Sequence, residues 1–376
     1  MTSNSLIQTE VIGGLGIITL DRAKALNALT LSMVRSLHGQ LLAWADDQAV
    51  HGVLLRGSAR APVEGKPSAT HFCAGGDIRF MHEAATTGDL AIDDFFTEEY
   101  ALDHLIHVYP KPFVAWMEGI TMGGGMGLAQ GCSLRVVTET VRMAMPETRI
   151  GLFPDVAGGY FLSRCKGHVG EYLGVVGPHI NAGDALALGL ADMQAEAASL
   201  CELLDGLKAS PVESGAELTE RLCAHAAAHP APGLHAPTLA GLHAQIDKHF
   251  SLPDVAAITA SLQADDSDWA RQTLAQMAGH SPLMMCVTLE QIRRARGMAL
   301  ADEFRMERDM VRHCFNLRKG AASETVEGVR ALAVDKDHQP RWSPATLAEV
   351  TPEMVQAFFD PVWPAHAHPL RDLKDA

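Results

Sequence analysis

Three consecutive glycines, Gly123–Gly125, restrict what this chain can fold into more than any other feature. They follow a strand-like apolar run, Phe113–Met117, and lead into a helix-like segment. Ordering three glycines is costly, because glycine loses more backbone freedom on folding than any other residue. Two arrangements offset that cost: a helix N-terminus whose free N–H groups face a ligand oxygen, or close packing of a helix against a strand. The residues alone leave both open.

A second glycine turn lies earlier in the chain, in the run Cys73-Ala74-Gly75-Gly76-Asp77. It ends a strand-like stretch and brings an acid to the start of a helix-like one, which runs from near Asp77 towards Ala85. The run predicts either a tight turn closed by a helix cap or a close approach of the backbone to a ligand.

A third segment carries two carboxylates within apolar surroundings. Glu147 and Asp155 are eight residues apart and Gly158-Gly159 follows them. Carboxylates in apolar surroundings have perturbed proton affinity, which suits general acid/base work or nucleophilic attack. The structural alternative is a surface Glu147 and a helix-capping Asp155. Taken together, two backbone donor sites and two carboxylates fit thioester chemistry, in which N–H groups stabilise a developing oxyanion.

Alternating patterns before about residue 160 predict an α/β domain. The expected strands are Gly16–Leu20, Gly52–Arg56, Phe113–Met117 and Leu134–Val137, and the expected first helix is Leu31–Ala45. The later half is expected to be all α, with helices over Asp254–Gly279, Leu283–Arg296 and Leu300–Arg312 and with Ser281-Pro282 opening the middle one.

Composition narrows the class of partner. The chain has 376 residues, of which 47% are hydrophobic, so it is not disordered. Its formal net charge of −15 disfavours nucleic acid, because there is no basic surplus to neutralise phosphates. No apolar run approaches the roughly 18 residues of a membrane span, so no membrane partner is expected.

Location and cofactors are predicted from absences in the sequence. Met1–Glu10 lacks the basic start and apolar run of a signal peptide and the arginines of a transit peptide. Seven widely spaced cysteines, with no C-x-x-C, indicate buried reduced thiols in a cytoplasmic protein. The 18 histidines fit no metal-ligand spacing, so no metal is expected.

A dinucleotide-binding fingerprint is disfavoured. Read from Gly123 its third position is Leu128, and read from Gly125 it is Gln130, neither of which is the small residue required. The acid expected about 20 residues further on is also misplaced, because Glu139 comes too early.

At its three glycine and carboxylate segments the chain resembles the crotonase (enoyl-CoA hydratase/isomerase) superfamily. The C-A-G-G-D run, M-G-G-G after a strand, and M-P-E followed by G-G occur in that family's order and spacing, over about residues 15–195. The likeness is closer to the 3-hydroxyisobutyryl-CoA hydrolase group of that superfamily. This closer likeness extends over nearly the whole chain and rests on Phe95–Tyr100, Gly119–Gly127, Met145–Tyr160, Ser281-Pro282, Met306-Glu307, Glu327–Ala331, Asp335–Asp337 and Trp342–Ala345.

The resemblance implies a fold and a set of site residues. The fold would be a crotonase-like ββα spiral core over residues 1–200, with an α-helical C-terminal region over residues 201–376 packed on it. The oxyanion hole would be formed by the N–H groups of Gly76 and Gly124, and the catalytic pair would be Glu147 and Asp155. Substrate would be bound by Glu99 and Gly124, and the CoA moiety by Ala74, Gly75, Asp77 and Ile78 within the Cys73–Ile78 stretch.

One departure from the hydratase pattern decides which reaction the resemblance implies. Hydratases of the family carry a glutamate where this chain has Gly127, so only Glu147 of their acid pair remains, while Asp155 supplies a carboxylate from another place. This implies hydrolysis of 3-hydroxyisobutyryl-CoA to the free hydroxy acid and CoA, as in valine breakdown. Glu147 would either attack the thioester or activate water, and both routes stay open.

Two alternatives to the hydrolase remain. One is an enoyl-CoA hydratase or isomerase, and the other is a non-catalytic CoA-binding member. The expected partner is an acyl-CoA, with no cofactor besides the CoA of the substrate itself. A homo-oligomer is possible, because relatives commonly assemble through their C-terminal helices.

Overall fold

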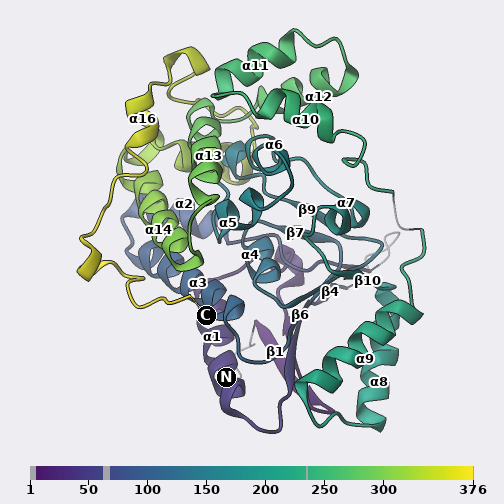
Figure 1. Ribbon diagram of the computed structural model, residues 1–376. Coiled ribbons are helices and arrows are strands. Elements are labelled where there is room, and N and C mark those ends of the chain that lie inside the picture. Colours follow the sequence, from purple (N-terminus) through teal and green to yellow (C-terminus); the bar gives the residue numbers. More distant parts are fainter. Residues whose placement is uncertain (1–5, 62–67, 234–235, 376) are drawn as a thin grey trace. The chain divides into compact units, whose positions relative to one another are not determined.

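The computed structural model describes residues 6–61, 68–233 and 236–375. The chain forms two compact units, each built from three separate segments. Figure 1 labels their helices and strands. The first unit comprises Met1–Gly76, Leu102–Met143 and His179–Ala240, and the second comprises Asp77–Ala101, Ala144–Pro178 and Gly241–Ala376. The expected division after residue 200 stays a prediction.

Strands and helices alternate in the first half of the chain, as expected. The strands are β1 Ile7–Ile12, β2 Leu15–Leu20, β3 Gly52–Gly57, β4 Ala59–Arg60, β5 Ala69–Thr70, β6 Phe113–Met117, β7 Ile120–Met122, β8 Leu134–Val137, β9 Arg142–Ala144 and β10 Met193–Gln194. The helices up to residue 228 are α1 Leu31–Asp46, α2 Ile78–Thr87, α3 Ala91–His107, α4 Gly124–Gln130, α5 Gly158–Ser163, α6 Val169–Val176, α7 Ala182–Ala187, α8 Leu200–Ala209 and α9 Gly215–Ala228. The later helices are α10 His243–Phe250, α11 Val255–Gln263, α12 Asp268–Met277, α13 Pro282–Ala295, α14 Leu300–Asn316, α15 Glu324–Val329 and α16 Pro352–Gln356.

The main sheet lies in the first unit and has the strand order β1-β2-β3-β6-β8-β10. β1 pairs with β2 antiparallel, and every other neighbouring pair is parallel. The four expected strands are confirmed, and this mixed α/β architecture is the predicted fold class. The expectation of an all-α later half is wrong at β10, a two-residue strand that pairs with Val136 and Val137 of β8. It is too short to show a period in sequence.

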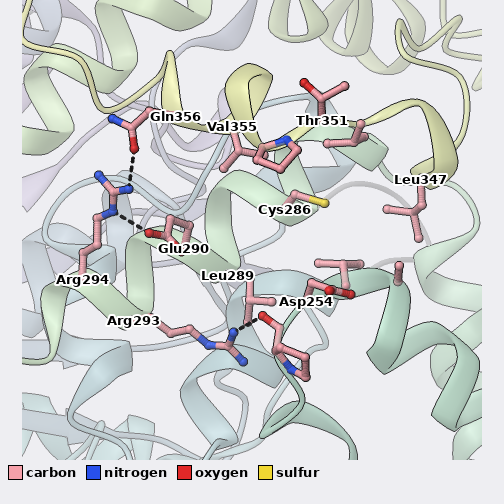
Figure 2. Close-up of a pocket in the computed structure, with 15 residues that line it drawn as sticks. Asp254, Cys286, Leu289, Glu290, Arg293, Arg294, Leu347, Thr351, Val355 and Gln356 are labelled. Atoms are coloured by element: carbon pink, nitrogen blue, oxygen red, sulfur yellow. Dashed lines mark hydrogen bonds and ion pairs between the residues drawn. The ribbon is translucent and has the colours of Figure 1, made fainter.

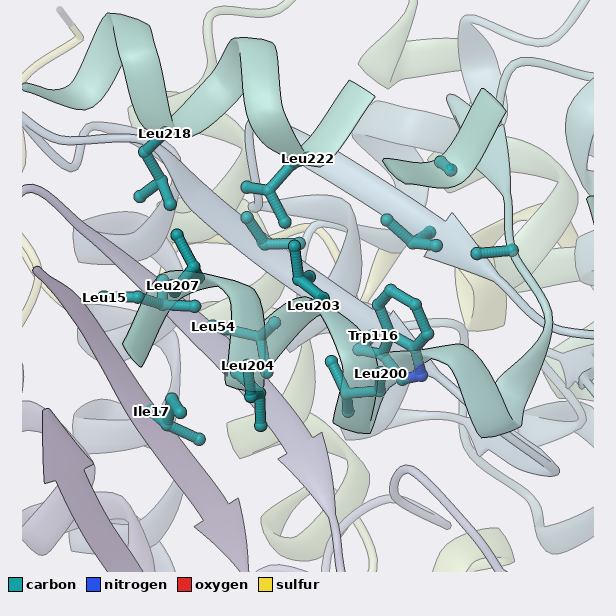
Figure 3. Close-up of a cluster of buried hydrophobic side chains, with 14 of the residues drawn as sticks. Leu15, Ile17, Leu54, Trp116, Leu200, Leu203, Leu204, Leu207, Leu218 and Leu222 are labelled. Atoms are coloured by element: carbon teal, nitrogen blue, oxygen red, sulfur yellow. The ribbon is translucent and has the colours of Figure 1, made fainter. Parts of the chain in front are cut away.

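Alternate residues of the sheet strands build the core of the first unit (Figure 3). Leu15 and Ile17 of β2, Leu54 of β3, and Trp116 of β6 point to one face, where α8 and α9 cover them with leucines (Figure 3). The covering leucines are Leu200, Leu203, Leu204, Leu207, Leu218 and Leu222. Burying each such side chain stabilises the fold by roughly 1.5–3 kcal/mol relative to leaving it exposed.

Helix starts were the most predictable local features. Asp77 caps α2 through its Oδ1, which accepts from the amides of Arg79 and Phe80. Ser281 caps α13, and Pro282 is its first residue, as predicted. The stretch over residues 254–279 is helical, as expected, and consists of two helices, α11 and α12, each with its own cap.

Two further expectations concern the chain as a whole. All seven cysteines are free, as expected. The expectation that the thiols are buried is wrong for Cys201 and Cys223, which are exposed. No helix among the described residues is long and apolar enough to cross a membrane. Of the Met1–Glu10 segment, residues 1–5 lie outside the described residues.

Candidate active site

The two glycine-rich turns lie side by side in the first unit. The amide of Met122 donates to the carbonyl oxygen of Cys73 at 3.0 Å, and the amide of Cys73 donates to that of Ile120 at 3.1 Å. These bonds hold the turn that contains Gly76 against the start of α4, where Gly124 is the first helical residue. The expectation that the glycines begin a helix after a strand is confirmed.

Two glycines are required at this junction. Gly75 has a φ of +99°, which residues with a side chain rarely adopt. A Cβ added to Gly125 would lie 2.2 Å from the carbonyl oxygen of Cys73, far inside van der Waals contact. The glycines therefore allow two backbones to approach, and close packing accounts for Gly125.

The predicted oxyanion donors are placed by these turns. Gly124 begins α4 and so its N–H has no partner within the helix, and a Cβ on Gly75 would lie only 3.3 Å from the Gly124 nitrogen. Among the described residues, neither Gly76 nor Gly124 donates a hydrogen bond from its amide. Both amides can therefore serve a ligand oxygen, and their catalytic role stays a prediction.

The predicted CoA-binding residues continue from the same turn. Ala74 and Gly75 belong to the first unit, whereas Asp77 and Ile78 open α2 in the second. The Asp77 carboxylate is used as a helix cap, so the structural explanation for this acid holds. Any contact of Asp77 with CoA would come from its backbone or its other oxygen.

Glu147 and Asp155 are both buried in the second unit, with 5% and 6% of their surfaces exposed. The structural alternatives proposed for them are wrong. Glu147 is not on the surface, and Asp155 does not cap a helix, because the N-cap of α5 is Ala157. The Tyr100 hydroxyl donates to Asp155 Oδ2 at 2.9 Å. Glu147 Oε2 makes no hydrogen bond to the described residues.

Burial sets the charge state of this pair. It raises the pKa of Glu147 well above the usual 4.5, and the negative charge of Asp155 raises it further. Burial also raises the pKa of Asp155, to about 6, while the Tyr100 hydrogen bond opposes the rise. Two carboxyl groups of unequal proton affinity suit the acid and base roles of one reaction.

Glu99 lies on α3, directly before Tyr100, and is 2% exposed. Its charge raises the pKa of Tyr100, after burial and the charges of Asp155 and Glu307. The structure thus brings three of the predicted residues, Glu99, Glu147 and Asp155, into one electrostatically linked group in the second unit.

Sequence reasoning missed four residues of this group. Tyr100 appeared only as the end of a family-like run, and Glu307 only within one. Glu307 and Glu303 accept from the amides of Ala157 and Tyr160, which follow Asp155, and Gln291 donates to the carbonyl oxygen of Pro154, which precedes it. The available signal was an acid pair at i and i+4 on the apolar side of α14, beside Phe304 and Val311.

The second unit also contains a cavity of about 490 Å³, lined by α13, the start of α11 and residues 347–356 (Figure 2). Its arginines are already engaged. Arg293 donates to the carbonyl oxygens of Leu252 and Pro253, and Arg294 donates to Glu290 and Gln356. None of the predicted site residues lines it.

Comparison with solved structures places the fold among CoA enzymes. A carnitinyl-CoA dehydratase from Mycobacterium thermoresistibile matches with a TM-score of 0.84 and 37% identity, over 96% of this chain and 98% of that one. An enoyl-CoA hydratase from Rhodobacter sphaeroides 2.4.1 matches with a TM-score of 0.82 and 32% identity, over 95% and 98%.

Curated relatives match at similar identity. The mitochondrial 3-hydroxyisobutyryl-CoA hydrolase of Danio rerio is 39% identical over 95% of this chain and 90% of its own length. The human protein of that name is 36% identical, over 92% and 86%. The model of the enoyl-CoA hydratase/isomerase family matches residues 15–359. With a match of that extent, the chain belongs to the enoyl-CoA hydratase/isomerase family.

Proposed function

We propose that this chain is a thioester hydrolase that converts 3-hydroxyisobutyryl-CoA and water to 3-hydroxyisobutyrate and free CoA. The observation that carries the proposal is the buried pair Glu147 and Asp155 within one unit, combined with Gly127 where hydratases of the family carry an acid. Relatives named for this hydrolase match over more than nine-tenths of the chain, which supports it.

Each site residue receives a role in this proposal. The N–H groups of Gly76 and Gly124 hold the thioester oxygen as it gains negative charge. Glu99 binds the 3-hydroxyl group of the acyl chain, and Asp155 orients that group or serves as the partner acid. The turn through Ala74, Gly75, Asp77 and Ile78 lines the adenine end of CoA, as the family resemblance implies, and no cofactor beyond CoA takes part.

Glu147 performs the bond-breaking step by one of two routes. As a nucleophile, its carboxylate attacks the thioester carbon, the C–S bond breaks, CoA leaves as thiolate, and water then hydrolyses the resulting anhydride. As a general base, it takes a proton from a water that attacks the same carbon. Mass spectrometry of acid-quenched enzyme distinguishes them, because only the first route adds the acyl mass to the Glu147 peptide.

The runner-up is hydration or dehydration of an acyl-CoA, which the names of the two similar structures favour. A hydratase needs a second acid beside Glu147, and the family position for it is Gly127. The two reactions differ in their products. Hydrolysis releases a thiol, whereas hydration changes the absorbance of the enoyl group and leaves the thioester intact.

The first prediction is that Glu147→Gln abolishes thiol release from 3-hydroxyisobutyryl-CoA, with a loss of about 10³-fold or more in kcat. Amide and carboxyl are similar in size, so folding should be retained. Thiol release is followed with a thiol reagent after subtracting the signal of the exposed Cys201 and Cys223. Near-full activity of this variant would refute the role of Glu147, and enoyl absorbance changes without thiol release would replace the hydrolase by a hydratase.

The pathway, the compartment and the assembly belong to the same proposal. The reaction fits valine degradation, and the free cysteines fit a cytoplasmic location. The vertebrate relatives are named mitochondrial. Imaging of a fluorescent fusion tests the location, and sedimentation tests whether the chain assembles as a homo-oligomer.

A further inference from the structure

The turn that carries Asp155 is held from outside by two helices of the second unit. Gln291 of α13 donates to the carbonyl oxygen of Pro154 at 2.7 Å. Glu307 of α14 accepts from the amide of Ala157 at 2.8 Å. α5, which follows the turn, packs against both α13 and α14 (Figure 1).

Within the turn, the amide of Gly158 donates to the carbonyl oxygen of Asp155 at 2.8 Å, but the backbone between them is strained. Val156 and Ala157 both have left-handed backbones, with φ of 56° and 64°, a conformation that residues with side chains rarely adopt. α5 has no side-chain cap of its own, because its N-cap is Ala157. Of its first amides, Gly159 donates to Glu307 at 3.4 Å and Tyr160 to Glu303 at 3.2 Å.

We propose that Glu303 and Glu307 are positioning residues for Asp155: the pair holds the backbone turn after Asp155 through three amides, and it does so with one proton shared between the two carboxyl groups. This inference rests on the proposed function of Asp155. Both carboxyl groups are fully buried, and Gln291 also donates to Glu307, at 3.0 Å.

The contacts of the pair support the shared proton, because the two side chains are hydrogen-bonded to each other, which requires a proton on one of them, and Glu303 Oε2 is buried with no other hydrogen-bond partner among the described residues. Burial raises the pKa of Glu303 to about 7, and burial together with the charge of Glu303 raises that of Glu307 well above its usual range. Three other acidic groups face or influence this region: Asp155 in the turn, and Glu99 and Tyr100 on α3. On the opposite side, Arg164 at the end of α5 lowers the pKa of Glu303.

The steric environment matches this arrangement. A Cβ added to Gly159 would lie 2.5 Å from Glu303 Oε1. The glycine therefore lets the Glu303 carboxyl reach the start of α5. Glu303, Glu307 and Asp155 are all acidic. Loss of the shared proton would add a second negative charge to the Glu303–Glu307 pair, and repulsion between the pair and Asp155 would then displace the turn.

The test compares Glu307→Ala with Glu307→Gln in the full-length chain, with 3-hydroxyisobutyryl-CoA as substrate. The alanine removes the acceptor of Ala157, so kcat should fall about 100-fold, the cost of a misplacement of about 1 Å, with a much smaller change in KM. The glutamine keeps one carbonyl oxygen that can accept from Ala157, but its NH2 group cannot accept from Gly159 and Gln291 as the second carboxylate oxygen does, so kcat should recover only in part, to a value between those of the alanine variant and the wild type.

The pH profile separates positioning from general stability. In the wild type kcat should decline at alkaline pH, where the pair loses its proton, whereas Glu307→Gln has no such proton and should keep its activity there. A wild-type profile that stays flat into the alkaline range, or a decline that is unchanged in Glu307→Gln, would overturn the shared proton.

The matched control is Asp184→Ala. Asp184 is also fully buried and accepts from a backbone amide, that of Leu239, but it lies in the first unit outside the proposed machinery. It should lower the melting temperature and leave kcat of the folded protein unchanged. Gln291→Ala is the second variant, which removes the donor to Pro154 and should also lower kcat, so the inference stays testable if Glu307→Ala does not fold.

Hydrogen exchange distinguishes failure of this inference from failure of the proposed function. In Glu307→Ala the amides of residues 156–160 should exchange faster than in the wild type, whatever the substrate is. If the wild-type protein releases no thiol but Glu307→Ala still shows the faster exchange, the proposed hydrolase function is refuted, whereas the anchoring of the turn by Glu307 is supported. Thiol release at near wild-type kcat in Glu307→Ala would sink the positioning role alone.

Discussion

At the scale of single residues, the central question is which of the two carboxyl groups, Glu147 or Asp155, ionises first as pH rises. Both are buried, and the charge of Asp155 raises the pKa of Glu147. Asp155 therefore ionises first, with a pKa of about 6, and Glu147 follows at higher pH. A nucleophile or base must be ionised to act, so activity should rise as pH increases through the pKa of Glu147.

The second prediction follows from this coupling. Asp155→Asn removes the charge that raises the pKa of Glu147, so the acidic limb of the kcat profile should move to lower pH, although kcat itself falls. Tyr100→Phe is a separate check on Asp155 itself. It removes a hydrogen bond that lowers the pKa of Asp155, so Asp155 should titrate above about 6. Rate profiles of Asp155→Asn check this, and an acidic limb that stays at the wild-type pH would contradict it.

At the scale of elements, the junction of the two glycine turns should tolerate no side chain. The third prediction is that Gly125→Ala destabilises the fold by roughly 1–3 kcal/mol, because its Cβ would overlap the Cys73 carbonyl oxygen at 2.2 Å. The added methyl would also separate Gly76 from Gly124 and lower kcat. Urea unfolding and thiol release measure the two effects.

The matched control for this change is Gly39→Ala. Gly39 is exposed on α1, and a Cβ there meets nothing within 4 Å. Alanine is the better helix former by up to about 1 kcal/mol, so this variant should be more stable than the wild type. Equal destabilisation by both substitutions would mean that the effect at Gly125 is not steric.

How much of these elements could be predicted depends on how local their causes are. Ser281 and Asp77 cap helices that begin beside them, so the sequence predicted both caps. The start of α5 could not be predicted in this way. Its amides are bound by Glu303 and Glu307, which lie 143 to 150 residues further along the chain, and no local pattern encodes such a pairing.

The same distinction applies to the candidate site. Gly76, Gly124, Glu147 and Asp155 were found because each lies in a short run with a recognisable order. Tyr100 was missed as a partner of Asp155, because the two are 55 residues apart and meet only in the folded unit. The burial of Glu147 likewise depends on tertiary packing, which periodicity does not report.

At the scale of the whole molecule, different titratable groups change the free energy of unfolding in opposite directions as pH rises. Glu303 has a folded-state pKa of about 7 against 4.5, so its contribution is fully present below about 4.5 and is lost as pH rises through about 7. Two histidines with lowered pKa values act the other way. Burial lowers the pKa of His107 and His280 to about 4, so their contribution is lost as pH falls below the usual 6.5.

The last prediction isolates one of these terms by comparing two buried glutamates. Glu303→Gln removes a group whose shift from 4.5 to about 7 corresponds to roughly 3 kcal/mol, so this variant should gain stability relative to the wild type between about pH 5 and about pH 8. Glu327→Gln should do the reverse, because its ion pair with Arg330 lowers the pKa of Glu327 and stabilises the fold above the usual value. Urea unfolding at both pH values measures the free energies, and the histidine terms cancel because they are common to all three proteins. The same sign for both variants would contradict the assigned charge states, and with them the protonated pair that holds the Asp155 turn.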